Sequence, residues 1–243
     1  MRGLAAALTY GPSPVEDAIV RVEQALADFP QERAGEDHLA LLYAFAGRYE
    51  DAERAMGRSR RVRIELGQEI DHAGLSLDLA WIALLAGRPE RAEPELRAAA
   101  EVLERAGEVG LLSSVAALLA EVLYRLGREE EAGEWTRRSE RATPPEDVEA
   151  QASWRTIRAK VLARRGEAEE ALRLSAEGVE WIRRSDHLQA IGDCLSDQAE
   201  VLRLLGRDGE ARPVLEEALA VYERKGIVPS IERTRTLLAE IPA

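Results

Sequence analysis

A glycine followed by a charged residue closes an apolar stretch at five points along the chain. Successive occurrences are 40, 40, 39 and 40 residues apart, and this regularity indicates an internal repeat. Small residues keep fixed places around each glycine: seven positions before it, five after it, and twelve after it. The five glycines are Gly47, Gly87, Gly127, Gly166 and Gly206.

The segments on both sides of each glycine carry apolar residues at helical spacing, as Leu75, Leu79 and Ile82 do before Gly87. Glycine adopts the left-handed backbone of a tight turn at low cost, and small residues allow two helix axes to approach closely. Each repeat is therefore predicted to be two antiparallel helices joined at the glycine. The pattern predicts an all-α, right-handed superhelical solenoid with a period of about 40 residues and roughly thirteen helices.

We expect the whole chain, 1–243, to form one repeat domain. Its predicted parts are a truncated first repeat at 1–30, full repeats at 31–67, 68–107, 108–145, 146–186 and 187–226, and a terminal helix at 229–241. A start in mid-repeat favours the tail of a larger protein or a misplaced start codon. The terminal helix has no following partner, so its apolar residues either cap the array or stay open to a partner or second copy. These residues are Ile231, Leu237, Leu238 and Ile241.

Prolines mark several expected helix starts. Ser13 and Thr143, each followed by proline and with glutamate three positions on, match capping boxes. Pro94 and Pro213 lie seven positions after their glycines, inside the second helix of a repeat. We expect these two helices either to start late or to have a distorted first turn.

The charge balance restricts the partners. The chain has 45 acidic and 33 basic residues, a net charge of −12, which disfavours nucleic acid and anionic membrane surfaces. The basic run from Arg58 to Arg63 is interpreted as a solvated helix face. The longest uncharged stretch, 109–120, is too short to span a membrane, so we expect a cytoplasmic protein. Cys194 is the only cysteine, which excludes an intrachain disulfide and a cysteine-based metal site.

No pattern of catalytic residues is readable. Three Asp-His pairs begin at Asp37, Asp71 and Asp186, and we interpret them as helix caps because their distances from the repeat glycines differ. Neither lysine of the chain follows a glycine, so no phosphate-binding Walker loop is present. The sequence predicts a protein that is not an enzyme and has no catalytic, cofactor or metal site.

The small residues around the turn glycine resemble those of the tetratricopeptide repeat, although that repeat usually has 34 residues. The 40-residue form is similar to the C-terminal repeat regions of bacterial multidomain adenylate/guanylate-cyclase-like proteins and ATPase-type transcriptional activators. The stretches that carry this resemblance are 151–155 with 159–166, 199–207, and 219–226. It implies a repeat module of a bacterial signalling or transcriptional regulator, without the catalytic parts of such proteins.

The resemblance also implies that the first helix of each repeat lines a concave groove, with the residue after each small alanine pointing inward. The groove would be apolar and aromatic towards its N-terminal end and charged towards its C-terminal end. A positive patch of Arg125, Lys160 and Arg164 would seat a carboxylate, a phosphate or an acidic peptide. In the alternative, these charges pair among themselves and Trp81 belongs to the core. The expected groove residues are Phe45, Trp81, Leu85, Glu121, Tyr124, Arg125, Lys160, Arg164, Glu200 and Arg203.

The function that this reasoning favours is an interaction or ligand-sensing module that binds a protein, a peptide or a small molecule in its groove. The alternative is a structural or oligomerisation module without a groove ligand, forming a homodimer through its terminal helix.

Overall fold

The computed structural model describes residues 2–29 and 35–241, and these residues form thirteen α-helices and no strand. The predicted all-α solenoid is confirmed. The predicted boundary between 1–30 and 31–67 lies outside the described residues. The helices are α1 (Arg2–Tyr10), α2 (Val15–Asp28), α3 (Glu36–Phe45), α4 (Tyr49–Glu65), α5 (Glu69–Leu85), α6 (Pro89–Ala106), α7 (Val109–Arg125), α8 (Glu129–Ala142), α9 (Val148–Arg164), α10 (Ala168–Ile182), α11 (Leu188–Leu204), α12 (Asp208–Lys225) and α13 (Val228–Glu240).

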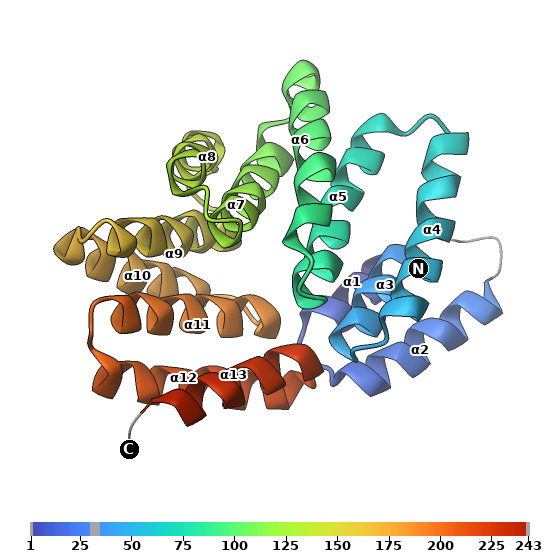
Figure 1. The fold of residues 1–243 in the computed structure, drawn as a ribbon. Helices are drawn as coiled ribbons and strands as arrows, with labels where there is room; N and C mark the ends of the chain where they lie inside the picture. The colour runs from blue at the N-terminus through green and yellow to red at the C-terminus, as the bar shows by residue number, and fades with distance from the viewer. Residues whose placement is uncertain (1, 30–34, 242–243) are drawn as a thin grey trace.

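The helices are arranged as pairs that stack on one another (Figure 1). Each odd-numbered helix from α3 to α11 packs against the even-numbered helix that follows it. The odd-numbered helices also pack against each other in succession, α3 on α5, α5 on α7, α7 on α9 and α9 on α11. They form a continuous inner layer, and the even-numbered helices cover it from outside.

The predicted glycine turns are all present. The five repeat glycines have left-handed backbones, with φ between 69° and 79°. At the first turn the Arg48 amide donates to the Tyr43 carbonyl at 2.8 Å and the Gly47 amide donates to the Ala44 carbonyl at 3.0 Å. This pair of bonds ends the first helix while satisfying its last carbonyls. The equivalent bonds recur at the other four turns.

The small residues lie where helices touch. Those seven before and five after each glycine are at most 1% exposed. Gly178 of α10 occupies the third small position of its repeat, and a Cβ added there would lie 2.5 Å from the Thr156 methyl group on α9. A larger side chain at such a position would force the two helices apart.

Several local expectations are wrong. Neither Ser13 nor Thr143 caps a helix: Pro14 precedes α2 without a side-chain cap, and Asp147 caps α9 by accepting from the Ala150 amide at 3.0 Å. Thr143 precedes a proline and is therefore held in an extended conformation, φ −73° and ψ 120°.

The helices that contain Pro94 and Pro213 do not start late, because α6 begins at Pro89 and α12 at Asp208. Their first turns do carry short-range bonds, from the Arg91 amide to the Arg88 carbonyl and from the Glu210 amide to the Arg207 carbonyl, both 3.0 Å. Such bonds from residue i to i−3 tighten a turn.

Only part of the basic run on α4 is a solvated face, since Arg61 is exposed and Arg60 half-exposed. Arg63 is buried and pairs with Asp37 of α3 at 2.6 Å, and Arg58 pairs with the buried Glu36 at 2.7 Å. These two pairs join the helices of the first complete repeat. Asp37 therefore holds α4 in place, and it is not the N-cap residue of α3, which is Gly35.

The two ends of the array meet. In Figure 1 the C-terminal helices α12 and α13 lie beside the N-terminal α1 and α2. The ammonium group of Lys225, at the end of α12, donates to the carbonyls of Leu8, Gly11 and Ser13 at 2.9, 2.7 and 2.8 Å. Lys225 is fully buried, and burial lowers its pKa to about 8. We call this contact the closing contact, because it turns the stack of repeats into a closed ring.

The terminal helix caps the array. Ile241 is buried, and Leu237 and Leu238 pack with it against α11 and α12, while Ile231 packs against the main core. Most of the apolar surface that could have met a second copy is therefore covered, although Leu237 and Leu238 stay half-buried.

The turn geometry gives a direct test. Gly127→Ala places a Cβ on a backbone with φ 75° and should lower the free energy of unfolding by about 1 kcal/mol. Gly57→Ala is the matched control, since Gly57 lies exposed in the middle of α4 with open space around it and should gain about 0.5–1 kcal/mol. Urea unfolding measures the free energy of unfolding of both variants. Equal effects of the two substitutions would contradict a left-handed turn at Gly127.

Removing the closing contact should open the ring. Lys225→Met leaves three carbonyls without their donor, at about 1–3 kcal/mol for each that water does not reach. We expect a lower melting temperature and a larger radius of gyration in small-angle X-ray scattering. Arg224→Met, one residue earlier, is the control. An unchanged radius for both variants would show that Lys225 does not hold the ends together.

Candidate functional site

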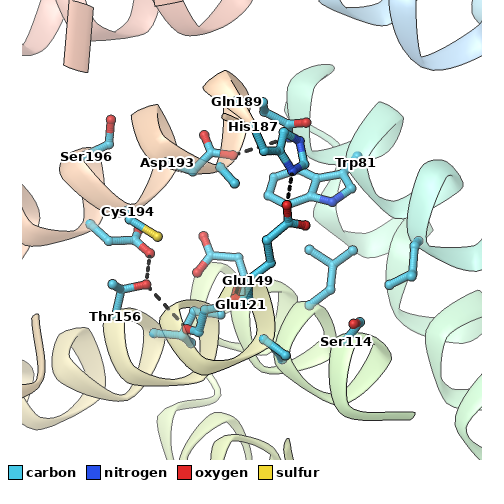
Figure 2. Close-up of a pocket in the computed structure, with 18 of the residues that line it drawn as sticks. Trp81, Ser114, Glu121, Glu149, Thr156, His187, Gln189, Asp193, Cys194 and Ser196 are labelled. Atoms are coloured by element: carbon cyan, nitrogen blue, oxygen red, sulfur yellow. Dashed lines mark hydrogen bonds and ion pairs between the residues drawn. The ribbon is translucent and has the colours of Figure 1, made fainter. Parts of the chain in front are cut away.

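A cavity of about 210 Å³ lies inside the ring (Figure 2). Five inner-layer or terminal helices, α1, α5, α7, α9 and α13, contribute side chains to its wall, and α11 contributes the largest share. Tyr10 of α1 and Arg233 of α13 both line it, so the cavity is complete only when the ends of the array meet. We call it the central cavity.

A second hollow of about 690 Å³ adjoins the central cavity. It runs over α7, α9, α11 and the start of α12, and α13 forms its far wall. Glu121, Arg125, Ser196, Asp197 and Arg233 line both hollows, so the two are continuous. We call this second hollow the side groove.

A buried ion cluster lies where the two hollows join. Lys160 of α9 is 1% exposed, and its ammonium group lies 2.6 Å from both Glu121 of α7 and Asp197 of α11. Arg125 approaches the other oxygen of Glu121 at 2.7 Å. The cluster therefore ties three successive inner helices together, and its charges are satisfied within the protein.

The cluster shifts the ionisation of its members. Burial opposes the charge on Glu121, but attraction to Lys160 and Arg125 outweighs it and lowers the pKa of Glu121 to about 2. Burial raises the pKa of Asp197 to about 6, although Lys160 opposes this shift. Burial would lower the pKa of Lys160, but its two carboxylate neighbours raise it overall. Lys160 is therefore charged at neutral pH.

The edge of the cluster is paired as well. The Tyr124 hydroxyl donates to Glu200 at 2.5 Å, and the Arg164 guanidinium lies 3.9 Å from the centre of the Tyr124 ring. Arg164 also pairs with Glu129 at 3.0 Å, and Arg203 pairs with Glu240 at 3.1 Å.

The ten residues expected in the groove separate into four sets. Trp81 lines the central cavity, and Glu121 and Arg125 line both hollows. Phe45 is fully buried in the main core, and Leu85 packs at the edge of that core; neither lines these two hollows. Five more line the side groove, namely Tyr124, Lys160, Arg164, Glu200 and Arg203.

The expected positive patch is not free. Its three cations, Arg125, Lys160 and Arg164, are each paired with a carboxylate, as the alternative interpretation held. The inward direction expected of Phe45 fails because the N-terminal helices fill this end of the ring with core.

One cation that the sequence analysis did not consider remains available. Arg233 of α13 lines both hollows, and no carboxylate of the described chain lies within ion-pair distance of it. Arginine is one of the commonest residue types in this chain, so no sequence signal distinguished it.

The histidines of two of the three Asp-His pairs contact the same tyrosine, Tyr10. The Tyr10 ring contacts His38 edge-on at 5.5 Å and His187 at 4.8 Å between ring centres. His187 also lies 3.0 Å from Glu149 across the gap between α9 and α11. The pairs differ in position within their repeats, but closure of the ring brings α1 between them.

Residues 2–29 and 35–241 contain no group of three or more His, Cys, Asp or Glu side chains placed to hold a metal ion. No helix within them combines the length and apolar character needed to cross a membrane.

Comparison with known proteins agrees with this architecture. Two family models, both described as tetratricopeptide repeat, match the chain, one at 149–224 and the other at 38–58, 73–98 and 113–138. No curated protein matches the sequence.

Solved structures share the fold. A Rap protein complexed with Competence and Sporulation Factor has a TM-score of 0.62 at 12% identity, over 93% of this chain and 68% of that chain. The kinesin light chain nearly identical TPR-like repeats of Podosopora anserina have a TM-score of 0.53 at 15% identity, over 76% of this chain and 92% of that chain. At these identities the likeness concerns the fold alone.

The ion cluster should be essential for folding. Lys160→Met removes the cation between two buried carboxylates and should cost about 3–5 kcal/mol at pH 7. The loss should shrink toward pH 5, because without Lys160 the pKa of Asp197 rises further above its unfolded value and the folded state takes up the proton. Urea unfolding at both pH values measures this.

Arg173→Met serves as the control, since Arg173 pairs with Glu170 and Glu177 on an exposed face and should matter little. If Lys160→Met were no worse than this control, the cluster would not stabilise the fold.

Proposed function

We propose that this chain, which is a tetratricopeptide-repeat protein, is a protein-interaction module that binds an acidic peptide segment in the side groove, with a carboxylate of the peptide on Arg233. The observation that carries the proposal is the charge pairing around the groove. Arg125, Lys160, Arg164 and Arg203 are each engaged by carboxylates of the protein, whereas Arg233 is not.

An unpaired guanidinium at the edge of a groove suits a carboxylate. It presents parallel N–H donors that match the two carboxylate oxygens, and such charge-assisted bonds are about twice as strong as neutral ones. Arg233 lies on α13, across the groove from the inner layer, so a bound peptide would contact both the terminal helix and the repeats.

The groove also offers apolar surface. Leu204, which is 41% exposed, lines it together with Leu237 of α13 and the more deeply placed Leu215. A peptide that places an apolar side chain on this surface and a carboxylate on Arg233 would use both properties of the groove. Peptide recognition commonly combines such a pocket with a polar anchor.

The comparisons supply context for the proposal. A protein of the same fold, the Rap protein, is known in complex with Competence and Sporulation Factor, which supports a binding role for this chain. We further propose, from the resemblance of the repeats, that the module belongs to a bacterial regulator. Binding across α13 and the inner layer would then stiffen the ring and pass this change to an attached domain.

The competing proposal is an oligomerisation module that pairs through an open apolar face of the terminal helix. This face is smaller than expected, because Ile241 is buried and Leu237 and Leu238 are half-buried against the array.

The role of Arg233 is tested with a displayed library of ten-residue peptides. The wild-type protein should enrich peptides that carry Asp, Glu or a free C-terminal carboxylate, and Arg233→Ala should weaken their binding about 10-fold or more. Fluorescence anisotropy of an enriched peptide gives the affinity.

Arg235→Ala is the matched control, because Arg235 lies on the same helix and is paired with Glu223 on the surface. It should bind the peptide within two-fold of the wild type. Equal binding by the Arg233 variant would refute the proposed contact. Charge reversal at Lys160 is unsuitable for this purpose, since it would disrupt the buried cluster.

A further inference from the structure

We propose that the central cavity binds a small organic cation bearing a primary ammonium group, held by Asp193 and Glu149 beside the indole ring of Trp81. This ligand and this site are separate from the peptide and side groove proposed above. The inference follows from the wall of the cavity, one group at a time.

The first step concerns negative charge without a matching cation. Five carboxylates line the cavity. The Tyr10 hydroxyl approaches one of them, Asp78, at 3.4 Å, and two others, Glu121 and Asp197, share Lys160. Asp193 instead accepts from the Tyr222 hydroxyl at 2.6 Å and from the Gln189 amide at 3.3 Å. Glu149 faces His187 at 3.0 Å and accepts from the Ser185 hydroxyl at 3.2 Å. Within the described ranges neither Asp193 nor Glu149 is paired with a lysine or arginine.

The second step is the cost of this arrangement. Burial raises the pKa of Asp193, and the hydrogen bond from Tyr222 and the more distant Arg233 and Arg125 only partly offset it. A carboxylate that is removed from water without a counter-ion is unfavourable. A ligand cation beside Asp193 would relieve this cost.

The third step is the aromatic lining. Trp81, Tyr10 and His187 all line the cavity. In Figure 2 the Trp81 indole and the side chains of Glu149, Asp193 and Glu121 border the same open space. Ring faces attract cations, and indole does so most strongly. Carboxylates and aromatic rings together favour an organic cation over a bare metal ion.

The fourth step distinguishes a primary ammonium from other cations. The Nδ1 atom of His187 lies 3.0 Å from Glu149, so the imidazole orients this carboxylate and does not itself receive the ligand. A primary ammonium has three N–H donors, and the carboxylate oxygens of Asp193 and Glu149 can accept them. A quaternary ammonium has no N–H group and would make no hydrogen bond to either carboxylate.

The fifth step sets the size and number of charges. The volume of about 210 Å³ is well above the space that a single water needs, and it suits an amine with a short carbon chain. Arg125 is neutralised by Glu121, but Arg233 lines the cavity with its charge unpaired and would repel a second positive group. A monoamine therefore fits better than a diamine. The ammonium could come from a free amine or from a lysine side chain.

The test uses n-butylammonium chloride, whose cation reproduces the end of a lysine side chain, with the purified chain at pH 7.5. Isothermal titration calorimetry should detect binding, and the melting temperature should rise with concentration at constant total chloride. The neutral analogue 1-butanol and the quaternary tetramethylammonium should bind at least 10-fold more weakly. Equal binding of 1-butanol would overturn the proposal, because it would show an apolar site only.

Two variants locate the site. Asp193→Asn and Glu149→Gln keep the size of each side chain and should each weaken n-butylammonium binding 10-fold or more, with the fold checked by circular dichroism. Asp208→Asn is the control, since Asp208 lines the side groove but not the central cavity. If both cavity variants bind n-butylammonium as the wild type does, the proposal is wrong.

A third variant separates this proposal from the peptide groove. Arg233→Ala removes a positive charge from the cavity wall, so it should bind n-butylammonium at least as tightly as the wild type while losing the acidic peptide. A lysine-containing peptide and its norleucine analogue then identify the source of the ammonium. If the lysine peptide displaces n-butylammonium and the norleucine analogue does not, the natural ligand is a lysine side chain of a peptide. If neither peptide displaces n-butylammonium, the natural ligand is a free amine.

Discussion

The whole architecture depends on how closely two helices approach at the glycine turns. A left-handed residue ends the first helix within one turn, and buried alanine, serine or glycine on both helices lets their axes come together. Because this unit recurs every 40 residues, its small rotation is repeated at each step. The accumulated curvature brings α12 and α13 back to α1 and α2, where Lys225 meets three carbonyls. Local backbone geometry thus creates a long-range contact.

The interior of this ring is charged, which is unusual for a helical core. Lys160 lies between Glu121 and Asp197, so one side chain of α9 engages both neighbouring inner helices. A buried ion pair adds little stability over a well-packed apolar contact, but misplacing one partner leaves an uncompensated charge. The cluster therefore penalises any sliding of α9 relative to α7 or α11. It lies where the side groove meets the central cavity, whose wall carries more carboxylates than cations.

The fold was predictable because a repeat amplifies weak signals: five glycines with three small positions each leave few alternatives. One site feature was also readable in principle. Glu121 and Lys160 each follow the small alanine of their repeat, and equivalent positions of adjacent repeats lie next to each other, so opposite charges there indicate an ion pair. The closing contact was not readable, because Lys225 binds backbone carbonyls, which every residue carries. The position of Arg233 and the meeting of His38 and His187 at Tyr10 depend on that contact and could not be predicted either.

Closure changes how such an array comes apart. In an open solenoid the terminal repeats have one neighbour each, so they fray first and the interior opens later. Here the first and last repeats are each other's missing neighbours, because the loop after α1 and the end of α12 share the buried ammonium of Lys225. Amide protons near both ends should consequently exchange at rates close to those of the middle. The molecule then opens as one cooperative unit, and a chain built from nearly independent modules acquires the all-or-none character of a globular domain.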